Sequence, residues 1–102
     1  MSERILVVDD EKEIADLIAL YLKNENYEVV QAYDGLQALD YAQTETFDLA
    51  ILDVMMPGMD GFSVCREIRK EYCYPVIMLT AKGEEVDKIT GLTLGADDYI
   101  TK

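Results

Sequence analysis

The sequence contains no histidine and no tryptophan, and it has only two cysteines and two prolines. The absence of histidine removes the commonest general base and the commonest metal ligand, and it excludes a phosphohistidine on this chain. Cys65 and Cys73 lack the C-x-x-C spacing of redox and zinc sites, so we interpret them as free, buried thiols in a reducing compartment. No Pro-rich or low-complexity stretch marks a linker.

Basic residues are also scarce, because 9 Lys and Arg face 21 Asp and Glu, which gives a net charge of −12. This charge repels phosphate backbones, so we expect no direct nucleic-acid binding by this chain. The apolar runs span only a few residues, which excludes a transmembrane helix. The start, Met1-Ser2-Glu3-Arg4, passes directly into a predicted strand and leaves no room for a signal peptide. We therefore expect a cytoplasmic protein without a membrane partner.

The sequence does contain a regular alternation of apolar runs and amphipathic segments. Strands are predicted at 4–9, 27–32, 48–53, 75–80 and 97–101, and the segments between them have helical spacing. A chain of 102 residues is one domain. Because successive βαβ crossovers are right-handed, this (βα)4β pattern predicts an α/β fold with a parallel sheet and helices on both faces.

The composition of the strands predicts their order in the sheet. The second strand has a mixed composition that suits a sheet edge, whereas the runs at 5–8, 49–52 and 76–79 are continuously apolar, as in strands covered on both faces. The flavodoxin-like, doubly wound order 2-1-3-4-5 places the mixed strand at the edge and the topological switch between strands 1 and 3.

Polar residues follow four of the apolar runs: Asp9 and Asp10 the first, Asp53 the third, Thr80 the fourth and Lys102 the fifth. Because the carboxyl ends of parallel strands share one edge, we expect these residues to converge. Singly, each has an ordinary explanation; Asp10, for example, could cap the first helix, and Lys102 could be a solvated tail. Their joint position at one edge favours a functional site.

The chemistry of this set points to phosphoryl transfer. Two unit charges ~4 Å apart repel by roughly 4 kcal/mol at an effective dielectric near 20, so three carboxylates need a proton or a cation. Oxygen ligands without imidazole or thiolate favour Mg²⁺. Thr80 and Lys102 add a hydroxyl donor and a cation that stabilise phosphoryl oxygens. Asp53, central in the sheet, is the candidate nucleophile, and Asp9 and Asp10 are the candidate metal-binding pair.

Four sequence blocks resemble the signatures of response-regulator receiver domains, which have this flavodoxin-like (CheY-like) fold. The blocks are ILVVDDE at 5–11, LDVMMPGMDG at 52–61, MLTAK at 78–82 and GADDYITK at 95–102. The last block is similar to the OmpR/PhoB subfamily, in which a receiver is joined to a DNA-binding winged helix. The stretches 20–27 and 85–92 resemble one particular regulator of that group.

The resemblance implies a specific role for each acidic residue. Asp53 would accept a phosphoryl group from the phosphohistidine of a sensor histidine kinase. Asp10 and Asp53 would bind Mg²⁺ directly, Asp9 through a water molecule, and Met55 through its backbone carbonyl. The protein would then be a phosphorylation-activated switch with slow autodephosphorylation, rather than a turnover enzyme.

The resemblance also implies how phosphorylation would be sensed. Lys102 would pair with the phosphoryl oxygens, Thr80 would move toward them, and Tyr99 would rotate inward as the switch aromatic. A half-buried strand tyrosine with its hydroxyl in water is the alternative for Tyr99. The small Ala81 would leave the phosphoryl group open to attacking water.

In the OmpR/PhoB group, the fourth helix and fifth strand form a homodimer surface through ion pairs. Lys88, Asp97 and Asp98 are possible contributors, although solvated surface charge is nearly as good an explanation. The family pattern continues with a fifth helix that this sequence does not contain. We therefore expect residues 1–102 to be a receiver domain truncated before that helix, with its DNA-binding output domain absent.

Three alternatives make different demands on the sequence. A Mg²⁺-dependent phosphohydrolase needs a second carboxylate two residues beyond the nucleophile, where this chain has Met55. A flavodoxin-like FMN carrier needs a Ser-, Thr- and Gly-rich first loop, whereas Asp9, Asp10 and Glu11 repel phosphate unless a metal intervenes. A degenerate receiver that works only through protein contacts does not need the intact acidic set.

Overall fold

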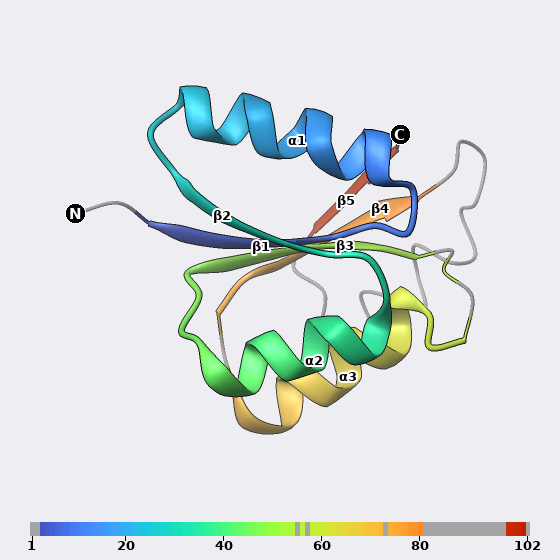
Figure 1. Cartoon of the computed structure of the whole chain (residues 1–102). Coiled ribbons are helices and arrows are strands. Elements are labelled where there is room, and N and C mark those ends of the chain that lie inside the picture. Colours follow the sequence, from blue (N-terminus) through green and yellow to red (C-terminus); the bar gives the residue numbers. More distant parts are fainter. Residues whose placement is uncertain (1–2, 55, 57, 73, 81–97, 102) are drawn as a thin grey trace.

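The computed structural model of the chain describes residues 3–54, 56, 58–72, 74–80 and 98–101 (Figure 1). Strands and helices alternate over most of this part of the chain. The elements are β1 (Arg4–Val8), α1 (Lys12–Asn24), β2 (Glu28–Ala32), α2 (Gly35–Thr44), β3 (Leu49–Asp53), α3 (Gly61–Glu71), β4 (Val76–Thr80) and β5 (Asp98–Thr101). The predicted helix between the last two strands lies outside the described residues.

The strands form one parallel sheet in the order β2-β1-β3-β4-β5. The predicted order of the first four strands is confirmed, and the backbone of β5 pairs with β4. Each predicted strand begins or ends within one residue of the observed one. The mixed second strand lies at the sheet edge, as its composition predicted. The topological switch therefore falls between β1 and β3.

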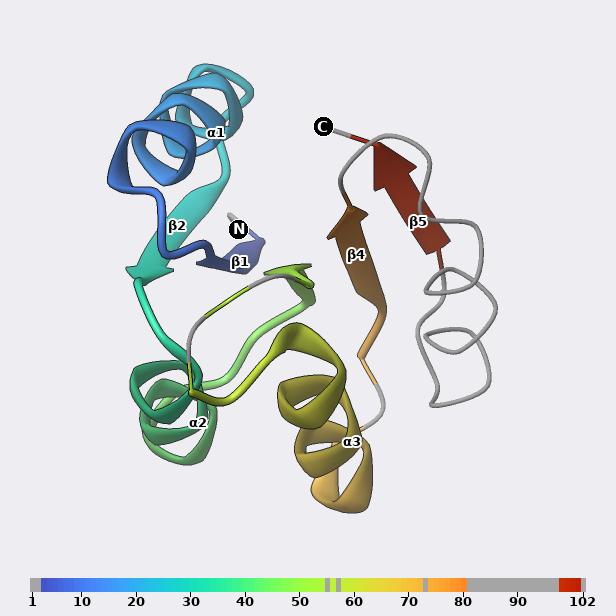
Figure 2. The same cartoon turned by 90° about the vertical axis from the view of Figure 1, so that its right-hand side faces the viewer.

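The helices cover the two faces of the sheet unequally. α1 lies on one face near β1 and β2, whereas α2 and α3 lie together on the other face (Figures 1 and 2). The larger core cluster, on the α2 and α3 side, includes Leu6, Leu52, Ile68 and Met78. Cys65 in α3 is buried and forms no disulfide among the described residues, which confirms its predicted burial; Cys73 lies outside the described residues.

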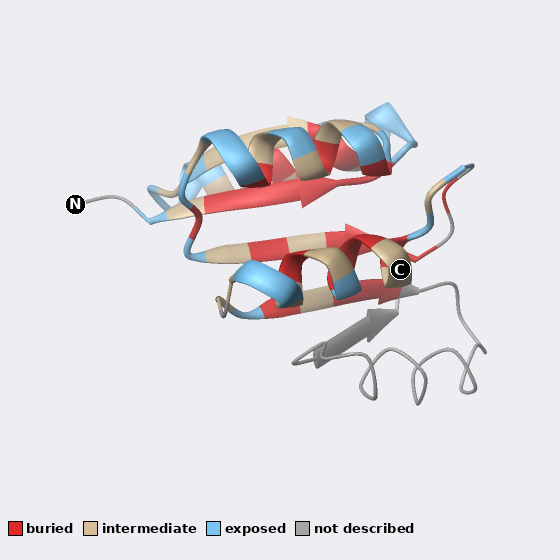
Figure 3. Ribbon diagram, turned by 90° about the horizontal axis from the view of Figure 1, so that it is seen from below, coloured by how far each residue is buried: buried red, intermediate tan, exposed pale blue. Residues whose placement is uncertain are grey.

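The smaller core cluster, on the α1 side, contains Ile5, Val7 and Ala15. Leu49 and Ile51 of β3 pack against it but are only partly buried, and Ile77 of β4, the register partner of Ile51, is also partly buried. Figure 3 shows the fully buried residues of the described part gathered along the sheet and the helix faces that meet it. No helix in the described ranges is long and apolar enough to cross a membrane.

Local sequence explains where the helices begin. Asp34 caps α2 by accepting a hydrogen bond from the Gln37 amide at 2.7 Å, and Asp60 caps α3 by accepting from the Ser63 amide at 2.8 Å. α1 differs, because its N-cap residue is Glu11 and makes no side-chain capping bond. The proposed capping role of Asp10 is therefore wrong, since the helix begins one residue too late for it.

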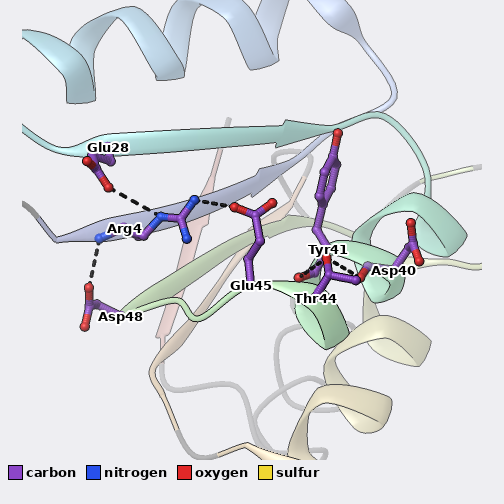
Figure 4. Close-up of polar contacts among 7 residues, drawn as sticks. All are labelled: Arg4, Glu28, Asp40, Tyr41, Thr44, Glu45 and Asp48. Atoms are coloured by element: carbon purple, nitrogen blue, oxygen red, sulfur yellow. Dashed lines mark hydrogen bonds and ion pairs between the residues drawn. The ribbon is translucent and has the colours of Figure 1, made fainter.

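The amino-terminal edge of the sheet is held by a network around Arg4 (Figure 4). Its guanidinium pairs with Glu45 and lies 3.4 Å from a Glu28 carboxylate oxygen, while its amide donates to Asp48 at 2.8 Å. The Arg4 Cζ also lies 5.7 Å from the centroid of the Phe47 ring. β1 is thus tied at this edge to β2 and to the segment between α2 and β3.

Candidate functional site

Three carboxylates meet at the carboxyl-terminal edge of the sheet, and we call Asp9, Asp10 and Asp53 the acidic cluster. Asp9 and Asp10 directly follow β1, and Asp53 is the last residue of β3. β1 and β3 are neighbours, with Val8 in register with Leu52, so the residues after them lie side by side. A carboxylate oxygen from each of the three lies within 4.8 Å of the others. The predicted convergence of the acids is confirmed.

Two members of the acidic cluster are buried and the third faces solvent. Asp9 is 0% exposed and Asp53 is 1% exposed, whereas Asp10 is exposed. The main chain fixes Asp9 firmly, because its amide donates to the Ala32 carbonyl at 3.1 Å and its carboxylate accepts from the Glu11 amide at 2.9 Å. The cluster is therefore a group of neighbouring carboxylates, two of them buried and one open to water.

The other predicted strand-end residue, Thr80, ends β4. Asp53 is in register with Leu79, so the backbone of Thr80 lies one residue beyond Asp53 on the neighbouring strand. Thr80 in turn pairs with Thr101 of β5. The backbone places Thr80 at the predicted edge, and its side chain lies outside the described part of the structure.

β5 carries two further predicted residues. The backbone of Tyr99 pairs with Met78, and that of Asp98 pairs with Ile77. Their side chains, and hence the switch role of Tyr99 and the interface role of Asp98, lie outside the described residues. Met55, Lys88, Asp97 and Lys102 also lie outside the described residues, so their predicted roles stay predictions.

The loop between β3 and α3 holds residues whose importance we did not predict. The Val54 amide donates to the Leu79 carbonyl at 3.0 Å, and the Gly61 amide donates to the Val54 carbonyl at 3.1 Å. α3 therefore begins directly against the end of β3. The sequence signal was Asp60-Gly61 at the end of the block at 52–61, just before a segment with helical spacing, and we assigned it no contact with Asp53.

The acidic cluster fits a small hard cation. Its donors are carboxylate oxygens on neighbouring strand ends, two of them buried, with Asp10 leaving an approach from solvent. Mg²⁺ prefers such ligands and keeps open positions for water and phosphoryl oxygens. The cation would offset the repulsion among the carboxylates that the fold brings together.

Comparisons with known proteins agree with this geometry. Residues 5–102 match the family model of the response regulator receiver domain. The chain is 61% identical over its full length to the regulatory protein VanR from Enterococcus faecium, of which it covers 44%. It thus spans less than half the length of the curated relatives it matches.

Solved structures show the same fold. Chemotaxis protein CheY4 from Vibrio cholerae matches with a TM-score of 0.95 and 34% identity, over 100% of this chain and 88% of that one. Response regulator TrrA from Thermotoga maritima, solved in complex with Mg²⁺–BeF, matches with a TM-score of 0.88 and 40% identity, over 98% of this chain and 86% of that one. With its acidic cluster and CheY-like α/β fold, the chain belongs to the family of response regulator receiver domains of two-component systems.

Proposed function

We propose that the chain is a phosphorylation-activated switch that accepts a phosphoryl group on Asp53. One observation carries the proposal: Asp53 is 1% exposed at the end of a central strand, yet a carboxylate oxygen of it lies within 4.8 Å of oxygens of Asp9 and Asp10. Burying like charges close together costs free energy, and a bound cation offsets that cost. The family assignment points the same way, because a receiver domain is a signalling module.

The chemical step is a phosphoryl transfer. A carboxylate oxygen of Asp53 attacks phosphorus, an O–P bond forms, and the N–P bond of the donor phosphohistidine breaks. The departing imidazole keeps the electron pair and takes up a proton from solvent. Mg²⁺ supplies charge neutralisation and orientation of the phosphoryl oxygens when bound. The chain's own contribution is to fix the nucleophile in a partly dry site that water reaches beside Asp10.

Within the acidic cluster, we assign direct metal contacts to Asp10 and Asp53 and a water-mediated contact to Asp9. This division has support in the hydrogen bond that the Asp9 carboxylate accepts from the Glu11 amide, which occupies one of its oxygens. The backbone carbonyl of Met55 would add a further oxygen. The structure of the similar response regulator TrrA in complex with Mg²⁺–BeF supports a role for Mg²⁺ in this chain.

The remaining steps of the switch belong to the carboxyl-terminal part of the chain. Lys102 and Thr80 would hold the phosphoryl oxygens, and Tyr99 would follow Thr80. The resulting surface, with Lys88, Asp97 and Asp98, would form an OmpR/PhoB-type homodimer. Phosphorylation would then bias an equilibrium between two states of the domain.

The 44% coverage of VanR supports a longer parent protein. In it, a fifth helix would cover the partly buried α1-side residues of β3 and β4, and a DNA-binding domain would follow. A sensor histidine kinase would be the phosphoryl donor, and we expect the protein to act in the cytoplasm on transcription. The domain would modify only itself and release phosphate slowly, which differs from the turnover of a phosphohydrolase. An FMN carrier is disfavoured, because the acidic cluster occupies the place where phosphate would bind.

Labelling with a small phosphodonor tests the proposal. The purified chain and a full-length relative are incubated with Mg²⁺ and acetyl phosphate, and the intact mass is followed for an increase of one phosphoryl group, about 80 Da. Asp53→Asn should abolish the adduct, while Asp40→Asn, which alters an exposed carboxylate on α2, should label like the wild type. Equal labelling of the Asp53→Asn variant would show that Asp53 is not the acceptor.

A further inference from the structure

The first residue of α3, Gly61, lies against the main chain of Asp53. A Cβ atom added to Gly61 would lie 2.1 Å from the Asp53 carbonyl oxygen and 2.8 Å from its carbonyl carbon. It would also lie 3.0 Å from the Met78 Cε. Contacts with backbone atoms at such distances cannot form without a shift of the main chain. Only glycine therefore lets α3 begin this close to the residue that carries the nucleophile.

Neither side of this contact can move easily. Asp53 ends a strand that lies between β1 and β4, and the amide of the next residue, Val54, donates to Leu79 on β4. On the other side, the Gly61 amide donates to the Val54 carbonyl, and the Asp60 cap fixes the first turn of the helix. A side chain at position 61 would therefore displace the Asp53 backbone, the start of α3, or both.

We propose that Gly61 is a positioning residue for the acidic cluster. The close contact between the start of α3 and the Asp53 carbonyl determines the direction of the Asp53 carboxylate. The inference rests on the proposed function, because it concerns the same phosphoacceptor site. A shift of about 1 Å in a reacting group can cost on the order of 100-fold in rate. The contact should therefore affect the geometry and the reaction rate of the phosphoacceptor site, and not only the stability of the domain.

The neighbouring helix supplies a matched control. α2 also begins with a buried glycine, Gly35, directly after a capping aspartate. A Cβ at Gly35 would lie 2.7 Å from the Met59 Cβ and 2.9 Å from the Met59 carbonyl oxygen, so substitution there is also costly. The two Asp-Gly helix starts share the same side-chain cap but differ in what the glycine touches, since Gly61 abuts the Asp53 main chain and Gly35 abuts Met59.

The test compares Gly61→Ala with Gly35→Ala in the full chain, after circular dichroism has established the temperature range in which both are folded. Calorimetric titration with MgCl2 gives the Mg²⁺ dissociation constant, and acetyl phosphate gives the initial labelling rate. We expect Gly61→Ala to weaken Mg²⁺ binding and to slow labelling by at least about tenfold. Gly35→Ala should change each quantity by less than about twofold, even where its melting temperature falls as far.

A second pair of variants applies if Gly61→Ala does not fold. Asp60→Ala removes the α3 cap and Asp34→Ala removes the α2 cap, and each should lower the melting temperature by a similar amount. A purely structural role predicts equal Mg²⁺ affinity in both variants. Positioning predicts that Asp60→Ala alone weakens Mg²⁺ binding, by roughly threefold or more, because only α3 rests on Asp53.

The outcomes separate this inference from the proposed function. If the wild type labels on Asp53 but folded Gly61→Ala matches it in Mg²⁺ affinity and rate, the positioning role is wrong and the phosphoacceptor role stands. If Gly35→Ala is impaired as strongly as Gly61→Ala, the effect is structural and the inference also fails. If the wild type binds Mg²⁺ but does not label, a selective loss of Mg²⁺ binding in Gly61→Ala still supports positioning, whereas the proposed function falls.

Discussion

The two ends of the parallel strands, which form the amino-terminal and carboxyl-terminal edges of the sheet, differ in the charges that surround their acidic residues. At the amino-terminal edge, Arg4 pairs with Glu28 and Glu45, so the chain supplies a cation for its own acids. At the carboxyl-terminal edge, the fold gathers the acidic cluster, and it buries Asp9 and Asp53 in doing so. The difference separates acids that hold the fold together from acids that are arranged for a partner.

The physical reason lies in burial and in the sign of the neighbouring charge. The Arg4 side chain is 35% exposed, so its ion pairs are screened by water and each contributes modestly to stability. Buried carboxylates that face each other instead oppose folding until a cation arrives. Changes at the amino-terminal edge should therefore alter stability, and changes at the acidic cluster should alter metal binding.

The largest expected effect is on Mg²⁺ affinity. Asp10→Asn should weaken Mg²⁺ binding on the order of 100-fold, because it removes the charge of a carboxylate that we propose as a metal ligand, at an exposed position away from the core. Arg4→Met should leave the Mg²⁺ dissociation constant within about twofold of the wild type. Titration calorimetry of the two variants checks both values. A loss of affinity in Arg4→Met as large as that in Asp10→Asn would contradict the separation of the edges.

The next effect is on the free energy of unfolding. Arg4→Met should destabilise the domain by about 1–2 kcal/mol, since it removes two partly exposed ion pairs and the contact with Phe47. Urea unfolding measures the loss, which should shrink as salt is added. Lys70→Met is the matched control, because the Lys70–Glu67 pair on α3 is more exposed, and it should cost less than about 0.5 kcal/mol. Equal losses in the two variants would show that the Arg4 network contributes no more stability than an ordinary exposed ion pair.

A smaller effect has opposite signs with and without metal. In EDTA, Asp10→Asn should raise the free energy of unfolding by about 0.5 kcal/mol, because it relieves repulsion within the acidic cluster. In excess Mg²⁺ the wild type should become the more stable of the two, since binding adds RT ln(1 + [Mg²⁺]/Kd) to its stability. Thermal melts in the two buffers check the reversal, with Asp40→Asn as the control that shows neither change. An Asp10→Asn variant that is less stable in both buffers would count against like-charge repulsion at this edge.

The acidic cluster could be predicted from sequence for a simple reason. Parallel strands that alternate with helices place all their carboxyl ends at one edge, so the positions of Asp9, Asp10 and Asp53 followed from the topology alone. The strand order followed from the mixed composition of 28–32, which suits an edge. The same rule places the backbone of Thr80 at that edge, as the structure has it.

The Arg4 network and the Gly61 contact could not be predicted, because each depends on distances that topology leaves open. Arg4 meets residues 24 to 44 positions away, and the choice of partners depends on strand register and on loop paths. Gly61 reads as an ordinary loop glycine until α3 is seen to begin on the Asp53 carbonyl. The alternative explanation of Asp10 as a helix cap does not hold, because the N-cap residue of α1 is Glu11.

The last expected effect appears at alkaline pH and again belongs to the amino-terminal edge. Tyr74, just before β4, packs edge-on against Phe47 and stacks on Tyr72. Burial, with a smaller contribution from the neighbouring Tyr72 and an opposing one from Arg69, raises the pKa of Tyr74 from 10.0 to about 12. The folded state thus keeps this proton at a pH where the unfolded chain has already released it.

The stability that depends on the protonated Tyr74 hydroxyl is fully present below pH 10. It is lost as the pH rises through about 12, because the unfolded state binds fewer protons than the folded state in that window. The free energy of unfolding should therefore fall more steeply from pH 10 to 12 in the wild type than in Tyr74→Phe, which keeps the ring but has no proton to lose. Urea midpoints across this range measure the difference, and Tyr21→Phe, on an exposed part of α1, should follow the wild type. Parallel pH profiles for the wild type and Tyr74→Phe would show that the loss of stability at alkaline pH does not come from Tyr74. Among the described residues, Tyr74 is the only aromatic group at the amino-terminal edge whose pKa is raised.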